Sequence, residues 1–292
     1  MKPLTFSDEL LSRRPPRGID VDTTLAHFAI ITILVEPEIA RRHLHSRFEL
    51  DLIQINGLEW ALVSMVPFVD QDFRFARIPW FQWQFGQTNY RMYATDSETG
   101  EHIAWFLGTS LDSWTVAVPR FFWKLPWHRA HIHFDCTYDA ALQRYTNYRM
   151  QTTNSWADAE VELSDTGQPP RELAGFDDLE TGLVLLTHPR KGYFYRRDGQ
   201  LGSYSIWHDR LQTTVGHIQS ARFDLLNTLG LAEPGEALNI HSVLMQQKTE
   251  FTIYLPPHRV YPVIPERTAS SISMFCLRSL LSHTIRKRSC RI

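Results

Sequence analysis

Residues 49–69, ELDLIQINGLEWALVSMVPFV, contain two apolar segments joined by Asn56-Gly57. Both central residues of a type I′ turn need a positive φ, and Asn followed by Gly adopts this conformation readily. Asn-Gly between two apolar segments is therefore the strongest short signal of a β-hairpin. The stretch predicts two antiparallel strands and indicates a fold built on β-sheet.

Strand-like segments recur on both sides of this hairpin. Residues 26–35, AHFAIITILV, are rich in β-branched side chains and predict a buried strand. Pro37 predicts a short helix to about His45, because proline is tolerated in the first helical turn. Further strands are expected at 84–95, 102–107, 129–137, 144–152, 156–163, 192–197, 201–208, 213–220, 237–246 and 249–255. Further helices are expected at 114–123, 177–186 and 222–231. Many short strands with few helices predict an α+β, mostly-β fold.

The length is compatible with one large domain. Of the 292 residues 43% are hydrophobic, and all-β barrels of about 250 residues often form a single domain. The loop 167–170 is short and the strands after it resemble those before it, so residues 19–260 are predicted to form one domain. Residues 1–18 are predicted to be an arm, and residues 261–292 a basic, flexible tail. An amphipathic helix over 272–285 is the alternative for the tail.

Composition and motifs exclude several classes of protein. The formal net charge of −2 argues against a nucleic-acid binder, which usually has a strong basic excess. No secretory signal is visible, and the longest apolar stretch is about half of what a membrane-spanning helix needs, so a cytoplasmic protein is expected. Cys136, Cys276 and Cys290 are too few and too far apart for a disulfide framework or a zinc cage. The chain has no GxSxG, P-loop, GxGxxG, HExxH or CxxC motif, and no cofactor is expected.

A polar row is predicted on one strand. Alternation on an extended segment places Asn89, Arg91 and Tyr93 on one face and Tyr90 and Met92 on the other. An amide, a guanidinium and a phenol on one face suit the lumen of a barrel, where Arg91 would hold a carboxylate through two hydrogen bonds. The alternative is that this face is exposed to water.

Histidine and aromatic residues supply further candidates. His131, His133 and Asp135 share a strand face, a spacing that metal-binding barrels use, but no fourth ligand is evident and no metal site is predicted. His128 and His208 are candidates for acid/base chemistry, although a histidine on a strand is more often structural. Trp105 belongs to a dense aromatic region, residues 80–127, that predicts core packing or a cavity for an apolar or aromatic ligand.

The order of several segments resembles the YqjF-like family, domain of unknown function 2071, within the acetoacetate decarboxylase-like superfamily. The resemblance covers about residues 27–260. It rests on HFAIITILVEPEIARRHL (27–44), Val66-Pro67-Phe68, Asn89-x-Arg91-x-Tyr93, Trp105-Phe106, Leu125-Pro126-x-x-Arg129-Ala130, Ile206-x-His208, the helix 225–231 and PPHRV (256–260). The resemblance implies a closed, cone-like antiparallel β-barrel with a few short peripheral helices, in agreement with the number of strands expected from the residues.

The superfamily's decarboxylases use a Schiff-base lysine within a Gly-Phe-Pro-Lys-Lys segment. Such a lysine needs a lowered pKa, so that its amine is unprotonated and nucleophilic. The corresponding segment here is Lys124-Leu125-Pro126-Trp127-His128, so Trp127 and His128 stand where the two lysines would follow the proline. The resemblance therefore implies the fold without the decarboxylase activity.

Three functions are open on this basis. The first is a protein without lysine chemistry that binds a small apolar, aromatic or carboxylate ligand in the barrel lumen, through Asn89, Arg91, Tyr93 and Trp105. The second is an enzyme acting on a small organic acid, with His128 or His208 as acid/base and Arg91 as anion clamp. The third is a structural or partner-binding barrel, and a homo-oligomer is compatible with all three. Convergence of the named residues on one cavity would favour the first two.

Overall fold

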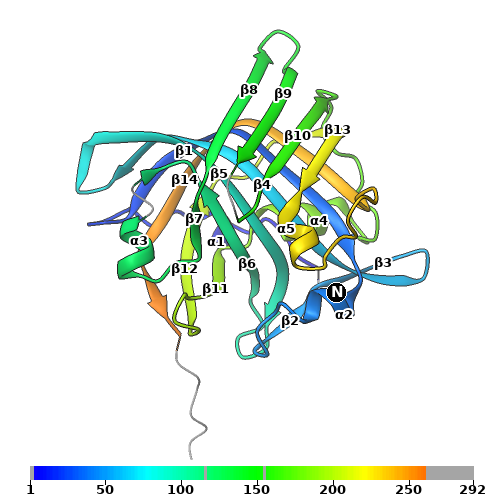
Figure 1. Ribbon diagram of the computed structural model, residues 1–292, viewed down its shortest axis with the longest axis horizontal. Helices are drawn as coiled ribbons and strands as arrows, with labels where there is room; N and C mark the ends of the chain where they lie inside the picture. Colours follow the sequence, from blue (N-terminus) through cyan, green and yellow to red (C-terminus); the bar gives the residue numbers. More distant parts are fainter. Residues whose placement is uncertain (1–2, 115–116, 154–155, 261–292) are drawn as a thin grey trace, which may run out of the picture. The chain divides into compact units, whose positions relative to one another are not determined.

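The computed structural model describes residues 3–114, 117–153 and 156–260. Seven strands close into a barrel, in the order β1 (Val21–Val35), β4 (Leu58–Phe75), β5 (Ile78–Asp96), β6 (His102–Leu111), β11 (Lys191–Tyr195), β12 (Leu201–His208) and β14 (Ile240–Arg259) (Figure 1). The ring is closed because β14 also pairs with β1, from Val21 opposite Ile253 to Ile33 opposite Ile240. The prediction of a mostly-β closed barrel is confirmed.

One pairing in the barrel corrects the expectation of a purely antiparallel barrel. Strands β6 and β11 run parallel, with Gly192 opposite Ala104 and Phe194 opposite Phe106. Parallel neighbours need a long crossover connection. Here about 80 residues separate the two strands, and they contain three further strands of a second sheet and helix α4 (Leu179–Thr187).

The second sheet continues from β14 through β13 (Thr214–Phe223), β10 (Ala159–Asp165), β9 (Arg144–Thr153) and β8 (His131–Asp139). These strands lie at the upper right of Figure 1. Their apolar side chains, among them Tyr148 and Met150, share one buried cluster with Ile31 and Ile33 of β1. The second sheet therefore covers part of the outer wall of the barrel.

The barrel interior has a core of its own. Leu25, Phe28 and Ile30 of β1 belong to this inner cluster, together with Leu185 and Leu186 of α4. Between Leu25 and Phe28 the backbone of His27 has φ of +51°, which breaks the alternation so that both neighbouring segments keep an apolar residue on the inner face. Helix α4 thus fills one end of the barrel.

The remaining elements are short. They are α1 (Asp8–Leu11), α2 (Pro37–Arg41), β2 (Phe48–Leu50), β3 (Leu52–Ile55), α3 (Ala117–Phe122), β7 (Trp127–Arg129) and α5 (Asp224–Thr228). The Asn56-Gly57 turn joins β3 to β4 with φ of 53° and 79°, as the opening stretch predicts. The expected single strand 49–55 is two strands, because β2 pairs with β5 and β3 with β4. The two strands expected at 237–246 and 249–255 are one continuous strand, β14.

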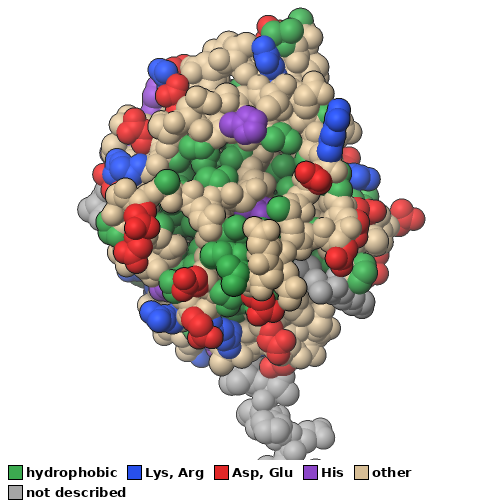
Figure 2. Space-filling model, turned by 90° about the vertical axis from the view of Figure 1, so that its right-hand side faces the viewer, with side chains coloured by type: hydrophobic (Ala, Val, Ile, Leu, Met, Phe, Trp, Pro, Cys, Tyr) green, Lys and Arg blue, Asp and Glu red, His purple; other side chains and the backbone are tan. Residues whose placement is uncertain are grey.

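Exposed aromatic side chains lie on the β4–β5 hairpin and on α3, two elements at the left of Figure 1. Trp80 and Phe81 are exposed on the β4–β5 hairpin, and Phe121 and Phe122 on α3. Figure 2 shows the opposite side, where charged side chains of both signs are scattered around hydrophobic ones. No helix in the described residues is long and apolar enough to cross a membrane. The predicted tail, residues 261–292, lies outside the described residues.

Candidate functional site

The barrel encloses a cavity of about 60 Å³. Residues of β1, β4, β5, β6, β7, β11, β12 and β14 line it, so the cavity is the lumen of the barrel. Aromatic side chains make up much of the wall: Phe28, Phe68, Phe73, Phe85, Phe106, Trp127, Tyr204 and Phe251. Phe73, Trp127 and Leu255 at one end are half-buried, whereas Arg91, Leu211 and Thr187 at the α4 end are buried. The cavity therefore opens at the hairpin end and is closed by α4.

Arg91 is a buried cation in this wall. Its side chain is 7% exposed and lines the cavity. Nη2 donates a hydrogen bond to the carbonyl of Leu186 at 2.8 Å, and Nε donates one to the hydroxyl of Tyr93 at 3.3 Å. Within the described part of the chain, Nη1 has no hydrogen-bond partner and no carboxylate forms an ion pair with Arg91.

The end of α4 explains why a cation is stable there. The last carbonyls of a helix have no partner within the helix and carry its partial negative charge. The carbonyl of Leu186 accepts hydrogen bonds from Arg91 and from the hydroxyl of Tyr93, the latter at 3.0 Å. The carbonyl of Leu185 lies 3.0 Å from Nε2 of His102. Arg91 is therefore held in place by the helix that closes the barrel.

Asn89 and Tyr93 lie beside Arg91 on β5, as predicted. Asn89 lines the cavity, and its Oδ1 accepts hydrogen bonds from Gln87 at 2.9 Å and from Thr109 at 2.8 Å. Tyr93 lies deeper, in the inner core, and contacts Arg91 through its hydroxyl. Tyr93 therefore positions Arg91 and does not itself line the cavity.

Trp105 is a correction to the predicted ligand-binding set. Ala104 and Phe106 line the cavity, and because side chains alternate along a strand, Trp105 faces the other side of β6. It is 1% exposed and packs against Phe48 and Tyr195, with ring centroids 5.6 Å and 4.9 Å away. Trp105 belongs to the core outside the barrel.

Of the two histidine candidates, only His208 lines the cavity. Its Nδ1 lies 2.8 Å from the carbonyl of Asp209 and its Nε2 lies 2.9 Å from the carbonyl of Thr187. Burial lowers the pKa of His208, and the hydrogen bonds to the two carbonyls oppose this shift, because a neutral ring can donate to only one of them. With both ring nitrogens against backbone oxygens, His208 has no nitrogen left to exchange a proton with a ligand.

His128 lies on β7, outside the set of residues that line the cavity. Its ring stacks on Trp156, with centroids 3.9 Å apart and planes 2° from parallel. Burial, together with the charges of Arg120 and Arg197, lowers the pKa of His128 to about 4. The geometry gives His128 a packing role next to the barrel.

Asp70 is a cavity residue that the sequence reasoning missed. It lies on β4, lines the cavity, and is 2% exposed. Its Oδ1 accepts a hydrogen bond from the hydroxyl of Thr23 at 3.0 Å. Burial raises the pKa of Asp70 to about 7, against the opposing effect of the Thr23 hydrogen bond. The available signal was an acidic residue directly after the apolar segment 58–69.

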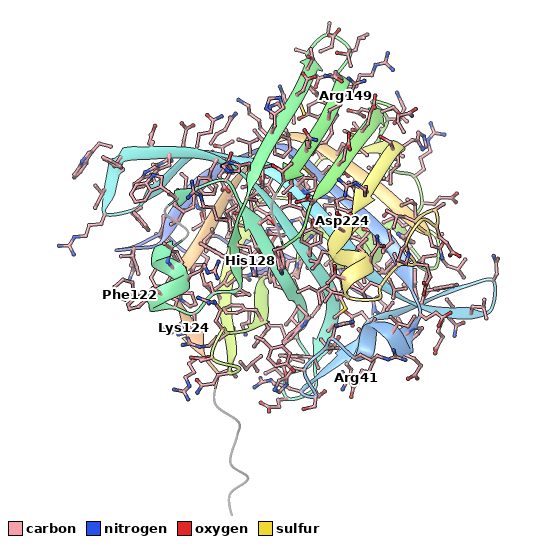
Figure 3. All side chains as sticks on the ribbon, viewed as in Figure 1. Arg41, Phe122, Lys124, His128, Arg149 and Asp224 are labelled. Carbon is pink, nitrogen blue, oxygen red and sulfur yellow. The ribbon has the colours of Figure 1, made fainter. Side chains whose placement is uncertain are left out.

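None of the described lysines lines the cavity. Lys124 lies beside α3, as Figure 3 shows, with its ammonium 5.0 Å from the ring centre of Phe121. Lys191 is paired with Glu101, and Lys248 is exposed. Among the described residues there is also no cluster of His, Cys, Asp and Glu side chains that could hold a metal ion.

Comparison with known proteins gives a family and a fold. The model of the family DUF2071, described as an uncharacterized conserved protein, matches residues 22–246. No curated protein matches the chain in sequence.

Three solved structures share the fold. Acetoacetate decarboxylase from Legionella pneumophila is 15% identical, with a TM-score of 0.54 over 87% of this chain and 94% of its own. The enduracididine biosynthesis enzyme MppR, complexed with pyruvate, is 14% identical, with a TM-score of 0.54 over 89% of this chain and 98% of its own. An acetoacetate decarboxylase-like enzyme from Sphingomonas wittichii is 8% identical, with a TM-score of 0.55 over 84% of this chain and 94% of its own. The resemblance to the acetoacetate decarboxylase-like superfamily is confirmed at the level of the fold.

Proposed function

The chain belongs to the DUF2071 family, and we propose that it binds a small apolar or aromatic carboxylic acid in the lumen of its barrel, with the carboxylate on Arg91. The observation that carries this proposal is a buried guanidinium that faces an apolar cavity without a carboxylate partner among the described residues. Burying an unpaired charge is costly, and the carbonyl of Leu186 offsets only part of this cost. A ligand carboxylate at Nη1 would complete the site.

The composition of the cavity wall supports the same class of ligand. Small-molecule sites are mostly apolar, with a few polar groups that fix the orientation of the ligand. Aromatic side chains supply the apolar wall here, and Asn89 lies next to Arg91. The complex of MppR with pyruvate is an example of this fold with a small carboxylate.

The experiment that tests the proposal compares a carboxylic acid with its alcohol. Isothermal titration calorimetry would measure binding of 4-phenylbutanoate and of 4-phenylbutan-1-ol, which share the same apolar part. We expect the acid to bind at least about tenfold more tightly, since a hydrogen bond to a charged group contributes about 1.5–3 kcal/mol. Equal affinities, or no binding of either compound, would contradict the proposal.

We further propose that the protein carries out no Schiff-base chemistry, because no described lysine reaches the cavity. Incubation with acetoacetate or pyruvate and then borohydride should leave the protein mass unchanged. Mass spectrometry of the intact chain checks this. A stable adduct on Lys124 or on any other lysine would overturn it.

A further inference from the structure

We propose that Asp70 forms a second polar subsite in the same cavity, and that the bound acid is an ω-hydroxy acid whose terminal hydroxyl contacts Asp70. This inference rests on the proposed function, because it assigns the other end of the same ligand. It narrows the ligand of the proposed function to acids that have a polar group at each end and an apolar chain between them.

The surroundings of Asp70 leave one carboxyl oxygen without a partner. Oδ1 accepts a hydrogen bond from Thr23, whose hydroxyl also lies 3.1 Å from the carbonyl of Gln71. Oδ2 has no hydrogen-bond partner among the described residues, although the side chain is 98% buried. Oδ2 is not among the completely buried side-chain atoms that lack a partner, so it is open to the cavity that Asp70 lines, and a ligand hydroxyl there can bond to it.

Register separates Asp70 from Arg91 along two neighbouring strands, β4 and β5. Asp70 lies opposite Phe85 on β5, and Arg91 is six residues further along that strand. At about 3.3 Å per residue, roughly 20 Å of strand separates the two positions, and because barrel strands tilt by about 35–45°, this is roughly 15 Å along the barrel axis. Val66 and Phe68, two apolar residues that line the cavity, lie on β4 between Ser64, which is opposite Arg91, and Asp70. A ligand that reaches both ends needs an extended apolar chain.

The two ends of the cavity differ in exposure, which orients the ligand. Arg91 lies at the closed end, against α4. Asp70 lies toward the hairpin, next to the half-buried Phe73. The carboxylate would thus lie at the closed end and the hydroxyl nearer the open end.

A hydroxyl fits Asp70 better than a charged group. A second carboxylate would place like charges together in a buried site, and an ammonium ion would have to lose its hydration there. A hydroxyl can both donate and accept a hydrogen bond. It therefore pairs with Asp70 whether that carboxyl is ionised or protonated.

The test compares ω-hydroxy acids with unsubstituted fatty acids of the same length, about 8 to 16 carbons, a range that brackets the span of the cavity. Calorimetry on the full-length protein should show that, at one chain length, the hydroxy acid binds about tenfold more tightly. Asp70→Leu should abolish this preference and still bind the unsubstituted acid. Asp135→Leu, which alters an exposed carboxylate on β8, is the matched control and should keep the preference.

The outcomes separate the two proposals. Equal binding of both series at every length, with the acid still preferred over its alcohol, would overturn the Asp70 subsite alone. A preference for the hydroxy acid that survives Asp70→Leu would also overturn it. If neither series binds, the proposed function fails as well. Circular dichroism checks that the variant is folded, and Asp70→Ala, which adds no bulk, replaces Asp70→Leu if it is not.

Discussion

Arg91→Met is expected to weaken the binding of 4-phenylbutanoate by about 1.5–3 kcal/mol, or roughly 10- to 150-fold, and to leave the binding of 4-phenylbutan-1-ol nearly unchanged. Met fills a similar volume but offers no hydrogen bond and no charge to the carboxylate. The carbonyl of Leu186 still accepts a hydrogen bond from Tyr93 in this variant, so the end of α4 is not left without a partner. Titration calorimetry with both compounds measures the effect.

Two further variants make the Arg91 result specific. Arg149→Met removes an arginine that lies on β9, outside the barrel, where it is paired with Glu162 (Figure 3). This control should bind the acid like the unmodified protein. Arg91→Lys keeps the charge but cannot form two parallel hydrogen bonds to a carboxylate. Its affinity for the acid should lie between those of Arg91→Met and the unmodified protein. Equal acid binding by Arg91→Met and Arg149→Met would rule out Arg91 as the anchor.

The fold was predictable where the signals are local. Asn56-Gly57 predicts its hairpin because the turn needs positive φ at both residues, whatever the rest of the chain does. The parallel pairing of β6 with β11 was not predictable in this way, because it depends on where a long connection returns to the sheet. The end of β4 was also missed. Polar residues after Val69 are typical of a turn, but pairing with β1 and β5 extends the strand to Phe75.

The candidate site shows the same limit at the level of single side chains. Alternation grouped Asn89, Arg91 and Tyr93, because the irregularity of the β5–β6 pairing between Tyr90 and Arg91 adds its extra residue, Leu107, to β6 and not to β5. Trp105 was included because of the density of aromatic residues around it, and that density does not say which face of β6 is the inner one. On β1 the positive φ of His27 reverses which face of the sheet each later residue occupies. Nothing in the neighbouring sequence predicts this reversal.

Asp70→Asn is expected to stabilise the protein increasingly as the pH rises. The pKa of Asp70 is about 7 in the folded protein, because of burial, and about 4 in the unfolded chain. Between these values the folded protein holds a proton that the unfolded chain has lost, so each pH unit lowers the free energy of unfolding by about 1.4 kcal/mol. The stability that Asp70 contributes is thus present below about pH 4 and lost by about pH 7. Asn has no titratable proton, so the free energy of unfolding of the variant does not fall in this way as the pH rises.

Urea unfolding of both proteins at pH 5 and pH 8 measures this difference. The advantage of Asp70→Asn over the unmodified protein should grow by about 3 kcal/mol between the two pH values. Other groups that titrate in this range cancel in the comparison, because both proteins contain them. The raised pKa of Asp70 results from burial, opposed by the hydrogen bond from Thr23, and no charged side chain contributes to it. The strand neighbours of Asp70, Leu25 and Phe85, are apolar.

The control is Asp135→Asn, at an exposed position on β8, whose difference in stability from the unmodified protein should not grow between pH 5 and pH 8. A constant difference between pH 5 and pH 8 for Asp70→Asn would show that this carboxyl is ionised at both, and that the cavity wall around it is hydrated.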